Sequence, residues 1–472
     1  MEKIGILVVS YGAREVAMVD ALLQSKNYQV ELYIADKQRN PFNVEKATKH
    51  VVIPNLDVDE ICRFAQANKD NIDFALVGSE KPIIEGIRDQ IEKRTGIPVI
   101  CPKQKYALEE SKVEQRLLFS ELAPEANPKF KVFSPADFKD EEEVKKAVYK
   151  WLDELENQAV VKPDKPALGK GVGVWGDHFA NRNELFDHFM SSFKYGKVII
   201  EEKIDGEESS FMGFCDGKHF IPLPDTRDYK RAFDNDMGPN TGGMGSYKDT
   251  GDTLPFLTAA DRQAELELSS KIFWGWSAKI KDDTALRGVP LYLAFMHTGK
   301  GIKVLEINSR PGDPEIINLL ALIKEDFVEL CLSMIEGSLA RVTLEPTASV
   351  LTYKVPSDYG GYADIYHDQI DQAATNTPVD LSKAYALRLK YGNNIRIYPG
   401  SMELRNDGKN YALKSRAVGI LGIGESIEEA RQISQEGAKA ITGGGLWNRS
   451  DVASKNHISK AVSHMVHLRH KT

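Results

Sequence analysis

Residues 303–310 read Lys-Val-Leu-Glu-Ile-Asn-Ser-Arg, an apolar start followed by Glu306, Asn308 and Arg310 at alternate positions. On a β-strand, residues two apart share a face, so these three side chains point the same way if the strand extends that far. A carboxylate and an amide oxygen are hard ligands that Mg²⁺ accepts beside substrate phosphates. A nearby arginine can brace a phosphoryl group in transfer. The segment therefore favours a phosphoryl-transfer site, with a structural Glu306–Arg310 salt bridge as the alternative.

A second segment offers basic groups for phosphates. A predicted strand ends at Lys162, and a glycine-rich turn with Gly169, Lys170 and Gly171 follows. Glycines let backbone N–H groups approach phosphate oxygens, and lysines neutralise them. The turn is not a Walker A loop, because Gly171 follows Lys170 where Ser or Thr is required, and its glycine spacing is not a Rossmann fingerprint. Taken alone, such a segment is more often an ordinary surface turn.

The acidic segment at residues 201–208 is a candidate hinge. A strand end at Glu201-Glu202-Lys203-Ile204 can offer backbone N–H and C=O groups to an adenine edge. Glu208, a few residues later, can accept both ribose hydroxyls. In isolation an acidic surface turn is the favoured interpretation, because charge runs usually face solvent.

The loop at residues 225–247 contains Gly-Pro-Asn-Thr-Gly-Gly-Met-Gly at positions 238–245. Four glycines in eight residues suit a packed element poorly, and basic and acidic side chains precede them. We interpret the loop as a backbone nest that closes over an anionic or zwitterionic substrate. A disordered loop is the alternative, and Pro239, Thr241 and Met244 would be odd choices for it.

The pattern along the chain predicts three domains. In residues 1–104, continuous apolar runs at 4–9, 29–35, 74–77 and 98–101 alternate with helical spacing at 14–23, 58–67 and 84–92, which is typical of an open parallel sheet covered on both faces. Residues 105–338 predict an α+β core with hairpins at 209–223 and 291–307 and a mobile lid at about 130–195. Residues 339–472 predict a small α+β domain with strands at 349–355 and 384–388 and a helix at 426–441.

Composition excludes several classes of protein. The chain has 472 residues, 42% hydrophobic and 28% charged, which is typical of a globular multidomain protein. A net charge of -8 argues against nucleic-acid and membrane-surface binding. No apolar run approaches the ~18 residues of a membrane span, and the start of the chain does not resemble a signal peptide. Four widely spaced cysteines indicate a reducing compartment, so we expect a soluble cytoplasmic protein.

The order of these elements resembles that of the ATP-grasp superfamily, which clamps ATP between a lid and a core sheet. Two phosphate lysines, a hinge with a ribose carboxylate, and a Glu-x-Asn strand occur in the sequence Lys162, Lys170, Glu208, Glu306 and Asn308. The superfamily's usual earlier lysine matches Lys112.

The resemblance narrows at residues 238–245, which are similar to a signature of the glycinamide ribonucleotide synthetase family, the phosphoribosylamine–glycine ligases. Further similarity lies in Gly-Asp-Pro-Glu at 312–315, in Gly-Ala-Arg-Glu at 12–15, and in Ser-Arg-Ala-Val-Gly at 415–419. The likeness covers nearly the whole chain. It implies a ligase that makes glycinamide ribonucleotide in purine biosynthesis, from glycine, 5-phosphoribosylamine and ATP, through a glycyl phosphate.

The resemblance also implies residue roles. Mg²⁺, or Mn²⁺, would be held by Glu306 and Asn308. The residues implied for ATP are Lys112, Lys162, Gly169, Lys170, Gly171, Glu201, Glu202, Lys203, Ile204 and Glu208. The catalytic residues implied are Arg310, Asp228, Lys230 and Asp313. The residues implied for glycine and phosphoribosylamine are Gly12, Ala13, Arg14, Glu15, Glu80, Lys81, Pro82, Asn240, Thr241, Gly242, Gly243 and Gly312.

The chain departs from the family pattern at Val16, where members usually have His, at Lys81, and at Pro311 before the Gly-Asp-Pro-Glu segment. These departures leave the ATP residues intact and concern the acceptor site. The alternatives are an ATP-grasp ligase with another acceptor and a non-catalytic nucleotide-binding protein, and the protein is expected to be a monomer or a weak homodimer. His464, His467 and His470 could suggest a metal site, but a frayed amphipathic C-terminal helix is favoured because no carboxylate or cysteine accompanies them in the sequence.

Overall fold

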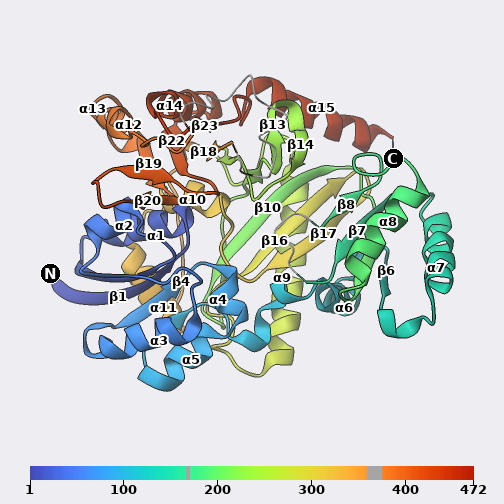
Figure 1. Ribbon diagram of the computed structural model, residues 1–472, viewed down its shortest axis with the longest axis horizontal. Helices are drawn as coiled ribbons and strands as arrows, with labels where there is room; N and C mark the ends of the chain where they lie inside the picture. The colour runs from blue at the N-terminus through green and yellow to red at the C-terminus, as the bar shows by residue number, and fades with distance from the viewer. Residues whose placement is uncertain (166–170, 358, 360–374, 472) are drawn as a thin grey trace.

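The computed structural model describes residues 1–165, 171–357, 359 and 375–471. Figure 1 shows the N-terminal region at the left, the C-terminal region above it, a central sheet, and a separate lobe at the right. Within the described residues, no helix is both long and apolar enough to cross a membrane.

The N-terminal region is a parallel sheet, as predicted; it has five strands in the order β3-β2-β1-β4-β5, and β3 lies outside the four predicted apolar runs. Alternate residues of β1 enter two different hydrophobic cores: Ile6 and Val8 face one, Leu7 and Val9 the other. The sheet is therefore buried on both faces, which explains its continuous apolar runs. The strands are β1 (Glu2–Ser10), β2 (Tyr28–Asp36), β3 (Lys49–Val52), β4 (Phe74–Val77) and β5 (Val99–Ile100), and the helices are α1 (Ala13–Leu23), α2 (Pro41–Lys46), α3 (Val58–Ala67), α4 (Glu80–Ile84) and α5 (Ile87–Thr95).

The central sheet is antiparallel, with strand order β11-β10-β16-β17, and it contains both predicted hairpins. Strand β17 lies at an edge and ends at Asn308, so Arg310 lies beyond it. Its pairing with β16 shifts register between Glu306 and Val304, which leaves Leu305 as a bulge. The strands are β10 (Glu207–Cys215), β11 (Phe220–Pro222), β16 (Gly288–Thr298) and β17 (Gly301–Asn308), and the flanking helices are α6 (Lys112–Leu122) and α9 (Ala259–Ile280).

The lobe at the right of Figure 1 corresponds to the predicted lid. It is a four-stranded sheet of order β6-β9-β7-β8 with its own core, in which Phe133, Phe186, Phe189 and Phe193 are buried together with apolar residues of the strands. A separate core is what allows such a lobe to move as a unit. Its elements are β6 (Phe130–Phe133), α7 (Glu141–Glu154), β7 (Ala159–Pro163), β8 (Gly173–Val174), α8 (Arg182–Phe193) and β9 (Val198–Glu202).

A third sheet joins the middle of the chain to its C-terminal part. Its order is β12-β15-β18-β22-β19, with β23 also pairing with β18. The first two strands come from the segment interpreted as a loop at 225–247, so that interpretation was wrong for much of its length. The strands are β12 (Arg227–Asp228), β15 (Gly245–Lys248), β18 (Ala348–Pro356), β19 (Ile395–Pro399), β22 (Val418–Gly424) and β23 (Leu446–Trp447).

Two predictions for the C-terminal part need correction. The strand predicted at 384–388 falls on two helices, α12 (Ser382–Ala386) and α13 (Arg388–Tyr391). The last helix, α15 (Lys455–His470), is not frayed, because Ala461 and Met465 are buried in a core with β15 and β18. The remaining elements are β13 (Arg231–Phe233), β14 (Met237–Asn240), α10 (Glu315–Leu320), α11 (Phe327–Glu336), β20 (Met402–Leu404), β21 (Asn410–Ala412) and α14 (Ile427–Ala440).

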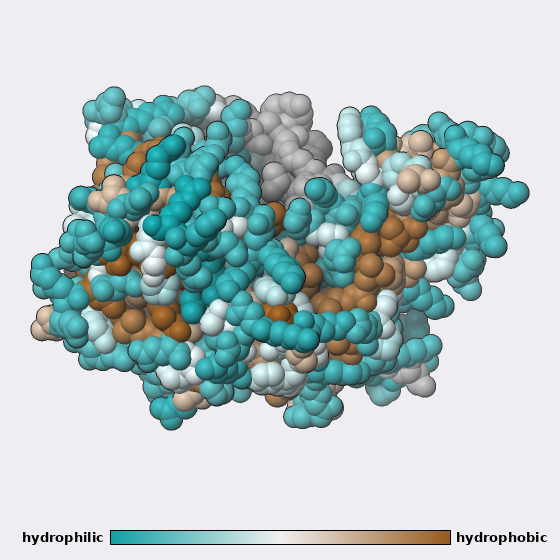
Figure 2. Space-filling view, turned by 90° about the horizontal axis from the view of Figure 1, so that it is seen from below, coloured by the Kyte–Doolittle hydropathy of each residue, from teal (hydrophilic) through white to brown (hydrophobic). Residues whose placement is uncertain are grey.

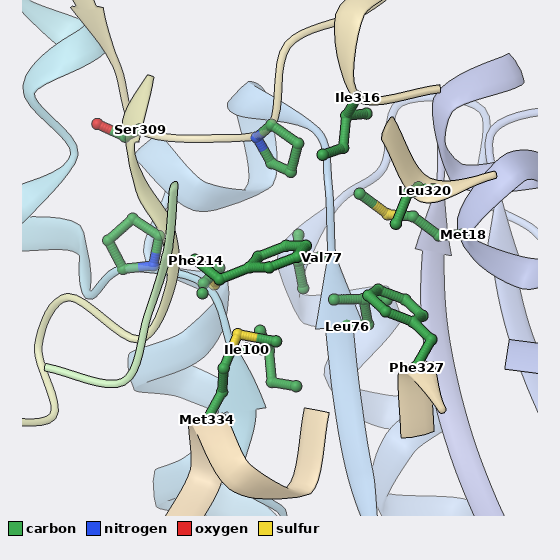
Figure 3. A pocket seen from close by; sticks show the side chains of 14 residues that line it. Met18, Leu76, Val77, Ile100, Phe214, Ser309, Ile316, Leu320, Phe327 and Met334 are labelled. Carbon is green, nitrogen blue, oxygen red and sulfur yellow. The ribbon is translucent and has the colours of Figure 1, made fainter. Parts of the chain in front are cut away.

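A small apolar cavity of about 20 Å³ lies where the N-terminal sheet packs against the centre of the molecule. Its lining includes Leu76, Phe214 and Met334, and Figure 3 shows these side chains converging while the Ser309 hydroxyl points away. The cavity is about the size of one water molecule and offers few polar partners. It is a packing defect of the domain interface rather than a substrate site.

The surface seen from below is mostly hydrophilic, with hydrophobic patches between the two ends (Figure 2).

Candidate active site

Most of the site residues predicted from the sequence lie at the junction of the central sheet, the lobe and the N-terminal and C-terminal regions. They come from β1–α1, α4, α6, β7, β9, β10, β12–β15 and the segment after β17. The contacts below show that they form one chain of neighbouring charges. Their roles remain predictions, and the geometry decides what each can do.

The two residues predicted to bind a metal, Glu306 and Asn308, lie side by side on β17. Asn308 Nδ2 donates to Glu306 Oε1 at 3.3 Å, so the two side chains do lie on one face. Burial alone would raise the pKa of Glu306, but Lys230, Lys112 and Lys162 outweigh it and lower the pKa. The carboxylate is therefore ionised and held close to an amide oxygen, a donor set that fits Mg²⁺ bound together with substrate phosphates.

The phosphate lysine of β7 is engaged with the hinge strand. Lys162 Nζ donates to Glu201 Oε2 at 2.8 Å. Burial lowers the pKa of Lys162 although Glu201 opposes it. Glu201 is buried as well, so at this residue the alternative of a solvent-facing acidic turn is wrong. Arg116 on α6, which sequence reasoning missed, donates to the other oxygen of Glu201 at 2.6 Å.

This arrangement predicts how Glu201 contributes to stability at different pH values. Burial would raise its pKa, but Arg116 and Lys162 hold it at about 2, below its usual value of 4.5. A lowered carboxyl pKa stabilises the fold above pH 4.5, and this contribution is lost as the pH falls towards 2. We expect Glu201→Gln to reduce the free energy of unfolding by about 3 kcal/mol at pH 7.

Urea unfolding of both proteins from pH 7 to pH 3 measures this difference, which should shrink below pH 4.5. Glu267→Gln, on an exposed face of α9, is the control. A difference that stays constant down to pH 3 would contradict the assignment.

The predicted ribose carboxylate, Glu208 on β10, forms an ion pair with Lys230. Burial lowers the pKa of Lys230, while Glu208, Glu306 and Asp228 raise it, and the net shift is upward. The pKa of Asp228 is raised well above its usual value by burial and by Glu315, against the opposing charge of Lys230. Lys230 therefore lies among three carboxylates and stays protonated, a charge suited to holding an anionic group.

The glycine-rich segment is held tightly rather than loosely. Thr241 N donates to Lys230 O at 2.7 Å, and Gly243 N donates to Thr241 Oγ1 at 3.1 Å. Asn240 ends β14, a short strand paired with β13. Gly243 has φ of 106°, and a Cβ there would lie 2.6 Å from Asp228 Oδ1 and 2.7 Å from Pro314 Cδ. Only glycine fits this position without displacing Asp228.

We therefore expect Gly243→Ala to lower the free energy of unfolding by about 3 kcal/mol, from backbone strain and overpacking. Activity should fall with it, because the added methyl group pushes against Asp228. Urea unfolding and initial rates measure the two effects. Gly251→Ala is the control, since a Cβ at Gly251 meets nothing within 4 Å. Equal behaviour of the two variants would show that Gly243 is not constrained.

Arg310 lies between two carboxylates, which corrects the alternative of a Glu306–Arg310 salt bridge. Its Nη2 donates to Glu109 Oε1 at 2.9 Å, and its Nε lies 3.5 Å from Glu80 Oε2. Burial alone would lower the pKa of Arg310, but the charges of Glu109 and Glu80 outweigh burial and raise it. Glu109 also accepts from Ser309 N at 3.2 Å, directly after Asn308. Arg310 thus lies beside the predicted metal pair and faces the N-terminal region.

The first-loop residues contact this cluster. Arg14 is buried, and its Nη1 donates to Pro311 O at 2.9 Å while its Nη2 lies 3.8 Å from Glu80 Oε2. The Glu15 carboxylate stabilises the start of α1, because it accepts a hydrogen bond from Gly12 N at 3.0 Å. Ala13, at the start of α1, and Pro82, in α4, are also buried.

Asp313 meets a residue absent from the predicted set. Arg416 Nη2 donates to Asp313 Oδ2 at 2.8 Å, and its Nη1 donates to Gly242 O at 2.5 Å. Tyr353 OH donates to the other Asp313 oxygen at 2.7 Å. The similarity at residues 415–419 was the available signal for Arg416. Through this arginine, the C-terminal sheet borders the predicted substrate site.

Several predicted residues lie outside the cluster or outside the described residues. Gly169 and Lys170 are among the residues the structure does not describe. Lys81 points to the rim, where its Nζ donates to Asn55 O at 2.6 Å. The side chains of Glu202 and Lys203 bond to backbone groups, Lys129 N and Trp175 O. The other predicted residues with described positions are Gly171, whose carbonyl lies 3.1 Å from His188 Nε2, Ile204, which follows β9, and Gly312, whose N–H donates to Met212 Sδ at 3.3 Å.

Comparison with known proteins defines the class of this fold. The family model for the ATP-grasp (A) domain of phosphoribosylglycinamide synthetase matches residues 129–316, and that for its N domain matches residues 4–110. The crystal structure of the phosphoribosylamine–glycine ligase of Thermotoga maritima superposes with a TM-score of 0.70 at 23% identity, covering 95% of this chain and 100% of that chain. The biotin carboxylase domain of Hydrogenobacter thermophilus 2-oxoglutarate carboxylase superposes with a TM-score of 0.63 at 15% identity, covering 98% and 93%. The chain is an ATP-grasp protein.

Full-length relatives identify the family within that class. The phosphoribosylamine–glycine ligase of Methanocella arvoryzae is 35% identical over 468 residues, which cover 98% of this chain and 99% of the relative. That of Pyrococcus furiosus is 32% identical over 467 residues, which cover 98% of each chain. The chain belongs to the phosphoribosylglycinamide synthetase family.

Proposed function

We propose that this protein is a phosphoribosylamine–glycine ligase, which joins glycine to 5-phosphoribosylamine at the expense of ATP in purine biosynthesis. The observation that carries the proposal is the Glu306–Asn308 pair, set among Lys112, Lys162 and Lys230 in a chain that matches the ligases over its full length. A nucleotide-binding protein without catalysis has little need of ionised metal ligands beside so many cations.

The nucleotide would lie between the lobe and the central sheet. Free backbone groups at the end of β9, within Glu201 to Ile204, would meet the adenine edge; the N–H groups of Glu202 and Lys203 already donate to Lys129 O and Gln158 O. Glu208 would accept the ribose hydroxyls in place of its contact with Lys230. Lys112 and Lys162 would neutralise phosphate oxygens, with Lys170 and its neighbouring glycines as further predicted contacts. Little covalent chemistry falls to side chains, so positioning and charge neutralisation carry the catalysis.

Mg²⁺ or Mn²⁺ would be held by Glu306 and Asn308, and would supply charge neutralisation between the phosphates of ATP. The structure of the Hydrogenobacter thermophilus domain is described as a complex with MgADP, which supports a magnesium nucleotide in this fold. Among the residues that the structure describes, no group of three or more His, Cys, Asp and Glu side chains could hold a metal by itself. Two protein ligands are nevertheless sufficient when substrate phosphates complete the shell.

The first step activates glycine. A carboxylate oxygen of glycine attacks the γ-phosphorus of ATP, the bond to the bridging oxygen breaks, and ADP leaves. Arg310, held by Glu109 and Glu80, would face the phosphoryl group in transfer and the acyl phosphate that results. Lys230 and Asp228, with the Asn240–Gly243 segment, would hold glycine. Because Lys230 remains protonated, it can pair with the glycine carboxylate before transfer.

The second step forms the amide. The amine of phosphoribosylamine attacks the acyl carbon, phosphate leaves, and the amine loses a proton. The acceptor would lie near the Gly12–Glu15 loop and the Glu80–Pro82 turn, with Asp313 and Gly312 opposite. The rim position of Lys81 suits a phosphate that enters from solvent. We further propose a cytoplasmic location, which the four buried and unpaired cysteines support.

The test is ADP release from Mg·ATP with glycine, in the presence and absence of freshly generated phosphoribosylamine. Release that requires both substrates, together with a new amide product, is the expected result. A panel of other carboxylates and amines is the control for specificity. ADP release that responds to neither substrate would overturn the proposal while leaving the fold unchanged.

A further inference from the structure

Arg116 is a buried arginine that joins the lobe to the central sheet. It extends from α6 and is 2% exposed. Its Nε donates to Glu201 Oε1 at 2.6 Å and its Nη2 to Glu201 Oε2 at 3.0 Å, so it grips the carboxylate of β9 with two nitrogens. The same guanidinium donates to Val304 O at 2.9 Å and to Leu305 O at 2.5 Å on β17. One side chain therefore touches both the hinge strand and the strand that carries the predicted metal ligands.

The contact between Arg116 and Glu201 determines whether the positive charge of Lys162 is available to a phosphate. Lys162 also donates to Glu201, but only to Oε2, at 2.8 Å. Because Arg116 binds both oxygens of Glu201, the negative charge of this carboxylate is still neutralised when Lys162 binds another anion. Without Arg116, Lys162 would be the sole described cation in hydrogen-bond contact with the Glu201 carboxylate. A phosphate would then have to compete with a buried ion pair for this lysine.

The second contact governs the direction of Glu306. Strand β17 is an edge strand, so its outward carbonyls lack a neighbouring strand. The bulge at Leu305 lies directly before Glu306, and bulges re-aim the side chains beside them. Arg116 satisfies the carbonyls at this bulge, and Gln115 on the same helix accepts from Ile307 N at 2.9 Å on the other side of Glu306. Helix α6 thus fixes the backbone on both sides of the metal carboxylate.

We propose that Arg116 is a positioning residue for nucleotide and metal binding. By binding Glu201, it leaves Lys162 available to a phosphate. By binding the carbonyls at the β17 bulge, it orients Glu306 towards the cation. The inference rests on the proposed function only in assuming that the site binds Mg·ATP. Arg116 itself is buried behind these side chains and acts through them.

Two variants separate the effect of the Arg116–Glu201 contact from that of the contacts with the β17 carbonyls. Arg116→Gln removes the charge and the guanidinium fork, so ATP affinity and the Mg²⁺ dependence of that affinity should both weaken by roughly 10- to 100-fold, as is usual when a partner behind metal ligands is lost. Arg116→Lys keeps a charge for Glu201 but cannot also reach both carbonyls with a rigid fork. It should restore much of the ATP affinity while the Mg²⁺ concentration for half-saturation stays raised about tenfold.

Calorimetric titration with ATP at several Mg²⁺ concentrations, without glycine or acceptor, measures both effects without turnover. Arg88→Lys is the matched control, because Arg88 is equally buried and binds Glu92 and the Cys101 carbonyl, neither of which belongs to the predicted site. It should lose stability without changing either binding constant. If Arg116→Gln does not fold, Arg116→Lys still tests the bulge contact.

A double variant tests the link to Glu201. If Arg116 acts by compensating that carboxylate, Arg116→Gln/Glu201→Gln should bind ATP several-fold more tightly than Arg116→Gln alone. If the double variant binds ATP no more tightly than Arg116→Gln, the proposed role of the Arg116–Glu201 contact is wrong. If Arg116→Lys leaves the Mg²⁺ dependence unchanged, the proposed role of the contacts with the β17 carbonyls is wrong. Because binding is measured without the acceptor, these results stand apart from the ligase assay, whose failure would concern the substrates alone.

Discussion

Replacing Glu306 by glutamine is expected to lower kcat for ADP formation about a thousandfold, equivalent to ~4 kcal/mol of lost transition-state stabilisation. The side chain keeps its size and its contact with Asn308 but loses the charge that Lys230, Lys112 and Lys162 surround. A neutral amide binds a divalent cation weakly, and the three lysines lose their common counter-charge. Steady-state rates over a range of Mg²⁺ and Mn²⁺ concentrations measure the effect.

Excess metal should recover only a small part of the lost rate, because occupancy of the site does not restore the negative charge that the carboxylate supplies among the three lysines. Glu267→Gln, on the exposed face of α9, is the matched control and should retain full activity. A Glu306→Gln protein that forms ADP within a factor of a few of the unmodified rate would remove the metal assignment. It would leave the Glu306–Asn308 contact as a structural feature of β17.

Replacing Arg310 by methionine is expected to lower kcat by about 10³, the lower range for an arginine that stabilises a transferring phosphoryl group. The apparent affinity for ATP should change little, because Arg310 contacts the N-terminal side of the cluster rather than Lys162. Amide formation under saturating substrates and a separate ATP titration give the two quantities.

Arg310→Lys keeps the charge but cannot span Glu109 and Glu80 as a guanidinium does, so an intermediate rate is expected. Arg341→Met is the control for loss of an arginine on the exposed surface, since the Arg341 side chain is 77% exposed. A rise in KM for ATP at constant kcat would assign Arg310 to ground-state binding and exclude it from the transfer step.

Local sequence patterns predicted the elements whose burial is decided locally. Four of the five strands of the N-terminal sheet were predicted, because strands buried on both faces, such as β1 between two cores, require an unbroken apolar run; β3, at Lys49–Val52, has no such run and was missed. The Glu306–Asn308 pair was found because strand periodicity places both residues on one face. The strand predicted at 384–388 was wrong because a short apolar run does not distinguish a strand from a helix whose one face is covered, as Ala384 is in α12.

Contacts between distant segments were not predictable in this way. Arg116 bonds to Val304 and Leu305 from a helix whose local pattern contains nothing unusual, and Arg416 reaches Asp313 from the C-terminal sheet. The segment at 225–247 has glycines typical of a loop, yet β15 gains order by pairing with β18, and β12 by pairing with β15. Such partners are set by the tertiary fold, and only similarity to a family pointed towards some of them.

The pairing of β15 with β18 also fixes the order in which a nascent chain can acquire its site. Tyr247 pairs with Val350, 103 positions later (350 − 247), and β18 in turn pairs with β22 at Val418 to Gly424. At roughly 5–20 residues per second, β12 and β15 wait for several seconds beside the ribosome before their partner strand is made. During that interval β12 and β15 can pair only with each other, and the edge of β15 that later meets β18 is open to other chains. We therefore expect a chain that ends before β22 to carry a nearly finished nucleotide domain beside an incomplete third sheet, and to lack a working site.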